Sequence, residues 1–169
     1  MSMYVLQVLT GKEMQIRGCL LDIGFETYVP QEESIIRSGG KWLTRIRTVF
    51  PSYVFVALDN VTRDYYRIRQ VTGIIRFLEL NGGAATALTR EEERLIRPFG
   101  NHVAPVSQVL QDGDRLIPLD GPLKIYSDAG MDIRYDKHRR QATVFRLPSI
   151  NRDAVLSFTF AKSPNNARG

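Results

Sequence analysis

The segment Tyr53–Leu58 (YVFVAL) restricts the possible folds of this chain more than any other stretch. It has the composition of a β-strand, and both of its alternating rows of side chains are apolar or aromatic. The rows are Val54, Val56 and Leu58 on one side and Tyr53, Phe55 and Ala57 on the other. Because successive side chains of a strand point to opposite faces of a sheet, other elements must cover this strand on both faces. The chain is therefore predicted to fold in layers around it.

The residues around this strand predict a mixture of strands and helices. Period-two alternation marks half-buried strands, and the capping-box pairs Thr10/Glu13 and Thr89/Glu92 mark two helix starts. The expected order is a strand at 3–9, a helix from 10 to about 22, a strand at 25–30, a hairpin at 33–50, the strand at 53–58, a helix at 60–70 capped by Asn60 or Thr62, a strand at 73–80 and a short helix from 89 that stops before Pro98. This order indicates an antiparallel-rich α+β fold of the split βαβ kind.

The part of the chain after residue 98 predicts a second, smaller unit. Residues 99–109 lose periodicity and carry Gly100 and Pro105, as linkers do. Only short strands are expected after it, at residues 115–119, 131–135, 142–147 and 155–160, which predicts a small β-barrel. The expected division is a domain at 1–98, a linker at 99–109, a barrel at 110–162 and a disordered tail at 163–169. Scattered Pro and Gly argue against a long helical hairpin in the barrel region.

Composition and charge are those of a globular protein and leave a polyanionic partner open. The 169 residues carry a formal net charge of +5. The single Cys19 excludes an intramolecular disulfide and a thiolate zinc site. Residues 1–9 lack the pattern of a signal peptide, and no window approaches the ~18 consecutive apolar residues of a membrane span. A soluble, cytoplasmic monomer without a membrane partner is expected.

The chain lacks the motifs of common catalytic and cofactor sites. It has no G-x-S-x-G elbow, Walker loop or dinucleotide fingerprint. His102 and His138 fall in different predicted domains, and the carboxylates of Glu91–Glu93 suit the first turn of a helix, where they complement its dipole. Cys19 is expected to be a small buried side chain. No enzyme activity, catalytic residue, metal or cofactor is expected.

Basic residues gather in two places and offer contacts for nucleic acid. Between residues 37 and 76 they outnumber the acidic ones, and a second cluster stands at Lys137–Arg140 (KHRR) in a predicted turn. The candidate contacts are Arg37, Lys41, Arg45, Lys137, Arg139 and Arg140. Such cations would bind phosphates without reading the sequence of bases. An ordinary solvated surface is the alternative for either cluster.

Three segments in this order resemble the NusG family of transcription elongation factors. They are YVLQVLTGKE from residue 4, the block from GGKW to RTVFPSYVFV, and GDRLIPLDGPLK with DKHRRQATV, which is similar to the family's KOW motif. The resemblance implies a NusG amino-terminal domain followed by an SH3-like KOW barrel. The GGKW hairpin and the HRRQA ending resemble the specialised LoaP-type antiterminators more than the housekeeping factor. The chain departs from the family at Ser52, at Ile125–Gly130 and at Ile150–Arg152.

The resemblance also implies partners. The row of Tyr53 and Phe55, with Phe50 and Pro51 at its end, would receive the clamp helices of RNA polymerase; the alternative is that it is simply core. The other side of the polymerase cleft would meet Asp64, Tyr65 and Tyr66, of which at least one tyrosine should be core. Nascent RNA or non-template DNA is a further expected partner, and the KOW barrel would contact a ribosomal protein or the Rho terminator.

Two functions remain open from the sequence. The first is an elongation factor that binds RNA polymerase and promotes processive elongation or antitermination of particular operons. The second is a stand-alone RNA-binding or ribosome-associated module, which would stack bases on exposed aromatic rings and bind RNA without the polymerase.

Overall fold

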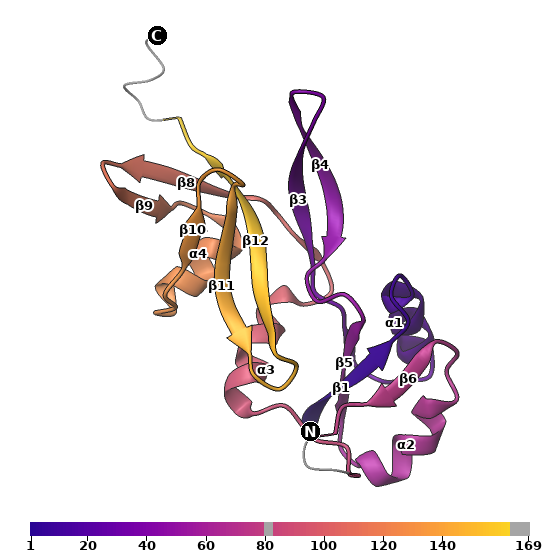
Figure 1. Cartoon of the computed structure of the whole chain (residues 1–169). Helices are drawn as coiled ribbons and strands as arrows, with labels where there is room; N and C mark the ends of the chain where they lie inside the picture. The colour runs from indigo at the N-terminus through magenta and orange to yellow at the C-terminus, as the bar shows by residue number, and fades with distance from the viewer. Residues whose placement is uncertain (80–82, 163–169) are drawn as a thin grey trace. The chain divides into compact units, whose positions relative to one another are not determined.

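The computed structural model describes residues 1–79 and 83–162 and has the predicted α+β fold (Figure 1). The chain divides into two compact units, which we describe separately. Unit 1 consists of Met1–Pro30, Phe50–His102 and Pro148–Asn151. Unit 2 consists of Gln31–Val49, Val103–Leu147 and the residues from Arg152 onward. The predicted tail at 163–169 lies outside the described residues.

Unit 1 is built on a four-stranded antiparallel sheet. In sheet order the strands are β2 (Thr27–Tyr28), β5 (Tyr53–Leu58), β1 (Ser2–Val8) and β6 (Ile74–Phe77). Helices α1 (Glu13–Asp22) and α2 (Val61–Arg69) cover one face. Their buried side chains Ile16, Leu20 and Ile68 pack with Leu6 and Val54 in the core. Both rows of β5 are covered, as predicted: only Tyr53 is half-buried, and the rest are buried.

The helix caps of unit 1 follow the prediction in two cases of three. Asn60 caps α2 by accepting from the Arg63 amide at 2.9 Å. Thr89 and Glu92 form the predicted capping box of α3 (Arg90–Ile96), and the 3₁₀ turn η1 (Arg97–Phe99) continues from it. The capping box expected at Thr10 and Glu13 is wrong, because α1 begins after Lys12 without a side-chain cap.

Unit 2 contains two sheets. The larger has the order β10 (Arg134–Asp136), β11 (Gln141–Leu147), β12 (Arg152–Phe160), β8 (Ser107–Asp112) and β9 (Arg115–Pro118). Neighbouring strands in this sheet are antiparallel, except that β12 and β8 are parallel. The smaller sheet has the order β4 (Lys41–Thr48), β3 (Gln31–Ser38) and β7 (Val103–Ala104). The predicted hairpin is thus β3–β4, and it lies in unit 2.

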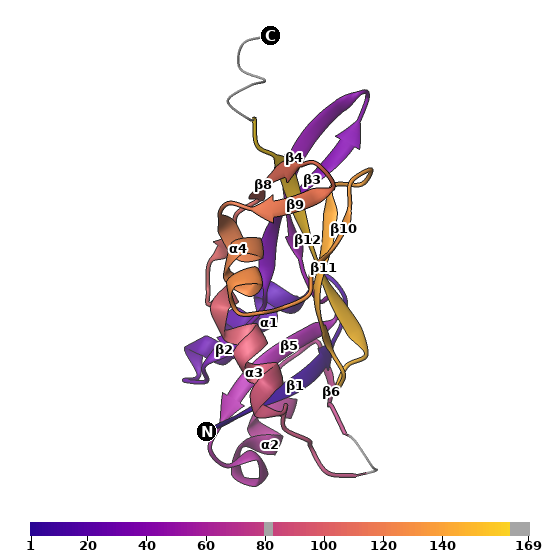
Figure 2. The same cartoon turned by 90° about the vertical axis from the view of Figure 1, so that its left-hand side faces the viewer.

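The structure adds one helix that the sequence reasoning missed. Helix α4 (Gly121–Asp128) packs beside β8 and β9, between the strands expected at residues 115–119 and 131–135 (Figure 2). Pro122 stands in its first turn, where a missing amide is harmless. Gly121 has φ +66°, and a Cβ there would lie 2.5 Å from the Ser107 hydroxyl oxygen, so this approach requires glycine. As expected, no long helical hairpin spans the described part of residues 115–160.

Residues 99–109, which we expected to form a linker, contain parts of several elements. Phe99 is buried at the end of η1, Val103–Ala104 form β7 beside β3, and β8 begins at Ser107. The proposed domain limits at residues 98 and 110 stay a prediction. None of the helices in the described part of the chain has the length and the apolar character of a membrane-spanning helix.

Candidate nucleic-acid interface

The two predicted basic clusters meet in unit 2 around one cleft of about 730 Å³. The hairpin β3–β4 forms one wall, and the turn between β10 and β11 forms the other. The lining residues are Ile35, Ile36, Arg37, Trp42, Lys137, His138, Arg139, Arg140 and Gln141. Four of the six predicted nucleic-acid contacts therefore lie together. In the sequence, Arg37 is separated by about a hundred residues from the other three, Lys137, Arg139 and Arg140.

The hairpin positions Arg37 and Trp42 as direct cross-strand partners. Gly39 and Gly40 form the two-residue turn between them with φ +58° and +77°, the left-handed values that a tight hairpin turn demands. Side chains of directly opposite residues share a face, so the guanidinium and the indole are adjacent. The Arg37 Cζ atom lies 5.6 Å from the centroid of the Trp42 ring.

The opposite wall is a turn fixed by its own polar groups. The Asp136 carboxylate accepts from the Arg139 amide at 3.0 Å, and the Arg140 carbonyl accepts from the Phe158 amide at 3.0 Å. Arg140 has φ +54°, a left-handed backbone conformation that favours glycine. This conformation returns the chain into β11 and holds the Arg140 side chain between two aromatic rings.

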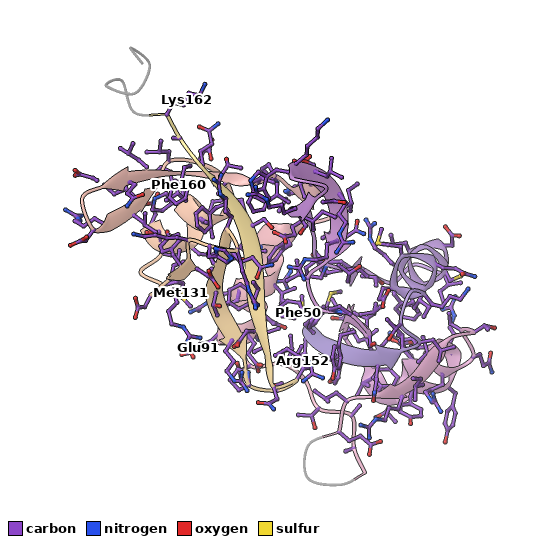
Figure 3. All side chains as sticks on the ribbon, turned by 45° about the horizontal axis from the view of Figure 1, so that its top comes forward. Phe50, Glu91, Met131, Arg152, Phe160 and Lys162 are labelled. Carbon is purple, nitrogen blue, oxygen red and sulfur yellow. The ribbon has the colours of Figure 1, made fainter. Side chains whose placement is uncertain are left out.

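Arg140 links the two walls by stacking. Its Cζ atom lies 5.0 Å from the Trp42 ring and 5.2 Å from the Phe160 ring, which stands near the end of β12 (Figure 3). Phe160 meets the buried Phe158 edge to face at 5.4 Å. Cation–π contacts of this kind stabilise by about 0.5–1 kcal/mol at exposed sites. The cleft is therefore an aromatic surface with cations arranged along it.

Lys41 and Arg45, the other two predicted nucleic-acid contacts, are exposed but do not line the cleft. Strand alternation places both on the hairpin face opposite to Trp42. The structure therefore does not group them with Arg37.

A nearly buried ion pair holds the base of the hairpin against β12. Arg47 donates to one Glu32 carboxylate oxygen from Nε at 3.1 Å and from Nη2 at 2.9 Å. The other Glu32 oxygen accepts from the Ser157 amide at 2.9 Å, and Arg47 also donates to the Val155 carbonyl. Burial raises the pKa of Glu32, against the lowering effect of Ser157 and Arg47. This network positions the wall that carries Arg37 and Trp42.

The residues expected to bind the polymerase lie in unit 1 and differ widely in exposure. Phe50 and Phe55 are buried and meet edge to face, with ring centroids 5.9 Å apart. Tyr53 is half-buried and Pro51 is exposed. Ser52 has φ +74°, and its amide donates to the Glu13 carboxylate at 3.0 Å. Glu13 thus holds the turn before β5, and it also accepts from the Gly11 amide at 3.0 Å, close to the start of its own helix.

Helix α2 presents its three candidate residues differently. Tyr65 stacks on Phe77 with centroids 5.0 Å apart, so one of the two tyrosines is part of the core, as expected. Tyr66 is 75% exposed. Asp64 is buried and accepts from the Arg63 guanidinium at 3.1 Å. Tyr66 is therefore the residue of this group that is most accessible to a partner.

Sequence reasoning missed the two aromatic rings that contact Arg140 and misplaced one other residue. Trp42 is the only tryptophan of the chain, and its place beside a glycine turn among cations was a usable signal. Phe160 gave none, because it reads as an ordinary strand residue. Cys19 was expected to be buried and is exposed. In residues 1–79 and 83–162, no group of His, Cys, Asp and Glu side chains could hold a metal ion.

Comparisons with known proteins agree on one family. The family model described as "Transcription termination factor nusG" matches residues 1–97. The transcription termination/antitermination protein NusG of Buchnera aphidicola is 23% identical over 154 residues, covering 83% of this chain and 84% of its own. NusG of Bacillus subtilis is 24% identical over 148 residues, with coverages of 80% and 84%.

Similarity to solved structures is weaker. One chain in the conformation B crystal structure of the MjSpt4:Spt5 complex is 15% identical, with a TM-score of 0.31. The match covers 92% of this chain and 91% of that one. The family is shown by the sequence match, because the family model spans residues 1–97, which is more than half of the chain. The chain belongs to the NusG family of transcription elongation and termination factors.

Proposed function

We propose that this protein binds RNA polymerase and promotes processive elongation or antitermination of particular operons, as a specialised LoaP-like member of its family. The observation that carries the proposal is the basic cleft of unit 2, in a chain whose first 97 residues match the NusG model. A factor of this kind needs no chemistry of its own. By binding one conformation of the polymerase better than another, it shifts the equilibrium between them by the difference in affinity.

Unit 1 supplies the proposed polymerase contacts. Tyr53 and Pro51 are accessible at the start of β5, while Phe50 and Phe55 support them from the core. Tyr66 projects from α2 and would contact a second part of the polymerase, beside Asp64 and Tyr65. Partly exposed aromatic side chains are typical anchors of protein interfaces.

Unit 2 supplies the proposed contact with nascent RNA or non-template DNA. Arg37, Lys137, Arg139 and Arg140 would hold phosphates in the cleft, and Lys41 and Arg45 would add contacts on the other face of the hairpin. Phosphate contacts release counterions, so the affinity should fall steeply with salt concentration. A ribosomal protein or the Rho terminator is a further proposed partner. The contact would be made by the larger sheet of unit 2, which contains parts of the segments similar to the KOW motif.

The same cleft favours a second candidate function, a stand-alone RNA-binding or ribosome-associated module. Both functions predict binding to nucleic acid, but only the first requires the polymerase. Co-purification from lysate with and without nuclease separates them. Retention of RNA polymerase after nuclease treatment supports the first. Ribosomal RNA that co-purifies only without nuclease, with no polymerase in either sample, supports the second.

The direct test is transcription in vitro across an intrinsic terminator with purified polymerase. The wild-type protein should raise read-through, and Tyr53→Ala should abolish the effect at concentrations where the wild type saturates. Lys124→Ala, on the exposed side of α4, serves as a matched control and should keep wild-type activity. Wild-type protein that neither binds the polymerase nor changes pausing or termination would contradict the proposal.

A further inference from the structure

The cleft of unit 2 has the size and chemistry of a pocket for a small aromatic ligand with negative charge. Its volume of about 730 Å³ falls within the roughly 300–1,000 Å³ of pockets that hold small molecules. A duplex keeps the faces of its bases stacked inside, whereas an unpaired base offers both faces to an aromatic side chain. A concave site with an indole in its wall therefore suits an unpaired nucleotide better than a duplex.

Trp42 has the exposure that a stacking surface needs. Its side chain is 37% exposed, although the guanidinium groups of Arg37 and Arg140 lie within 6 Å of its ring centroid. A guanidinium and a base stack on an aromatic ring in the same way, so one can replace the other. Arg140 retains a second aromatic partner in Phe160, at 5.2 Å, when it gives up the indole.

The backbone of Arg140 supports a functional role for this side chain. It is one of three non-glycine residues with positive φ in the described part of the chain. An arginine in this conformation is less stable than a glycine would be, and such outliers gather at binding sites. The conformation places a cation that contacts both Trp42 and Phe160.

We propose that this cleft binds one unpaired nucleotide of a single-stranded nucleic acid, with the base stacked on Trp42 in place of Arg140 and the phosphates held by Lys137, Arg139 and Arg140. The proposal rests on the proposed function and narrows its ligand. According to the proposal, the Arg140 guanidinium stacks on the Trp42 indole in the free protein and binds a phosphate in the complex.

The experiment uses the fluorescence of the full-length protein, because Trp42 is its only tryptophan. The probes are an RNA hexamer, a DNA hexamer of the same sequence, a blunt duplex and inorganic polyphosphate. A single strand should quench the emission saturably, with an affinity that falls with salt. Polyphosphate should compete for the site without matching that quenching. The hexamer that binds with the higher affinity indicates whether the natural ligand is a transcript or a DNA strand.

Binding of labelled hexamer to variants tests the stacking contact separately. Trp42→Ala should weaken binding about tenfold or more, since stacking of one base on an aromatic ring contributes that much. Trp42→Phe should stay within about threefold of the wild type, because it retains an aromatic face. Lys124→Ala, on helix α4 and outside the lining of the cleft, should keep the wild-type affinity and the wild-type maximal quenching.

Three results would overturn the inference: no quenching by either hexamer, equal quenching by polyphosphate, or an unchanged affinity of folded Trp42→Ala. None of these touches polymerase binding or terminator read-through. A Trp42→Ala protein with normal read-through and normal hexamer affinity would remove the nucleotide pocket and leave the proposed function intact.

Discussion

Arg47 and Glu32 form a two-bond ion pair in which the carboxylate is almost fully buried and the guanidinium is only 30% exposed. The pair joins the two strands of the hairpin at its base, and both partners also bond to β12. Removing one partner leaves a buried charge without compensation, whereas removing both does not.

Arg47→Met should therefore destabilise the protein by about 3 kcal/mol, and the double variant Glu32→Gln/Arg47→Met should recover more than half of that loss. The guanidinium is partly exposed, which sets the figure at the low end for buried pairs. Denaturant unfolding of the wild type, both single variants and the double variant gives the coupling free energy. Additive effects of the two substitutions would show that the pair is not coupled.

The pKa of Glu32 makes stability depend on pH in an unusual direction. Because burial raises this pKa above the ordinary 4.5, the folded state holds the proton more tightly than the unfolded chain. This contribution to the free energy of unfolding is fully present below pH 4.5. It is lost as the pH rises through the pKa that Glu32 has in the folded protein. Denaturant unfolding of wild type and Glu32→Gln over this window checks it, and the variant should lack the decline.

Glu92 should show the opposite dependence. Burial opposes its ionisation, but hydrogen bonds from the Ser149 hydroxyl and amide and from Thr89 outweigh burial and lower its pKa. The resulting stability is present above the ordinary 4.5 and is lost as the pH falls through the folded value.

Ser149→Ala removes one of these bonds. It should cost about 1–2 kcal/mol at neutral pH and less in acid, where Glu92 is protonated. Unfolding curves measured between about pH 3 and 7 would reveal the difference. An equal loss at both ends of the range would mean that Ser149 acts through packing and not through the carboxylate.

Phe55 and Tyr53 should separate core packing from polymerase binding. Phe55 is fully buried, so Phe55→Ala should destabilise unit 1 by about 3–5 kcal/mol and reduce every activity together. Tyr53 is half-buried, and Tyr53→Ala should cost about 1 kcal/mol. Circular dichroism and measurements of polymerase binding on both variants test this. Tyr53→Ala should stay folded and should no longer bind the polymerase. Unchanged affinity of the folded variant would remove Tyr53 from the interface.

The hairpin cations should act through charge alone. Replacing Arg37, Lys41 and Arg45 together with Ser should lower the affinity for RNA or single-stranded DNA and flatten its salt dependence by about one unit of slope per lost phosphate contact. Titrations at four or more salt concentrations provide the slope. If the slope of the triple variant equals that of the wild type, the hairpin does not contact phosphates.

The local elements of this protein could be predicted from residues that lie close together along the chain. The alternation of β1 and β5, the Asn60 cap and the Thr89/Glu92 capping box all depend on neighbours within a few residues, and each was predicted. The two basic clusters were also visible as composition. Helix α4 was not predicted: residues 120–130 fell between the strands expected at 115–119 and 131–135, although Pro122 is compatible with a helix start.

Which of these elements contact one another depends on the folded chain. Glu13 was assigned to the start of its own helix; its carboxylate accepts from the Gly11 amide there and also from the Ser52 amide on a distant turn. The hairpin was predicted as part of residues 1–98, a division that stays a prediction, and Glu32 and Arg47 bond it to β12. Arg140 reaches Trp42 because an unusual backbone conformation and Phe160 position it. Each of these contacts except that to Gly11 joins residues far apart in sequence, and periodicity and capping patterns describe only neighbours, so the cleft could not be predicted from them.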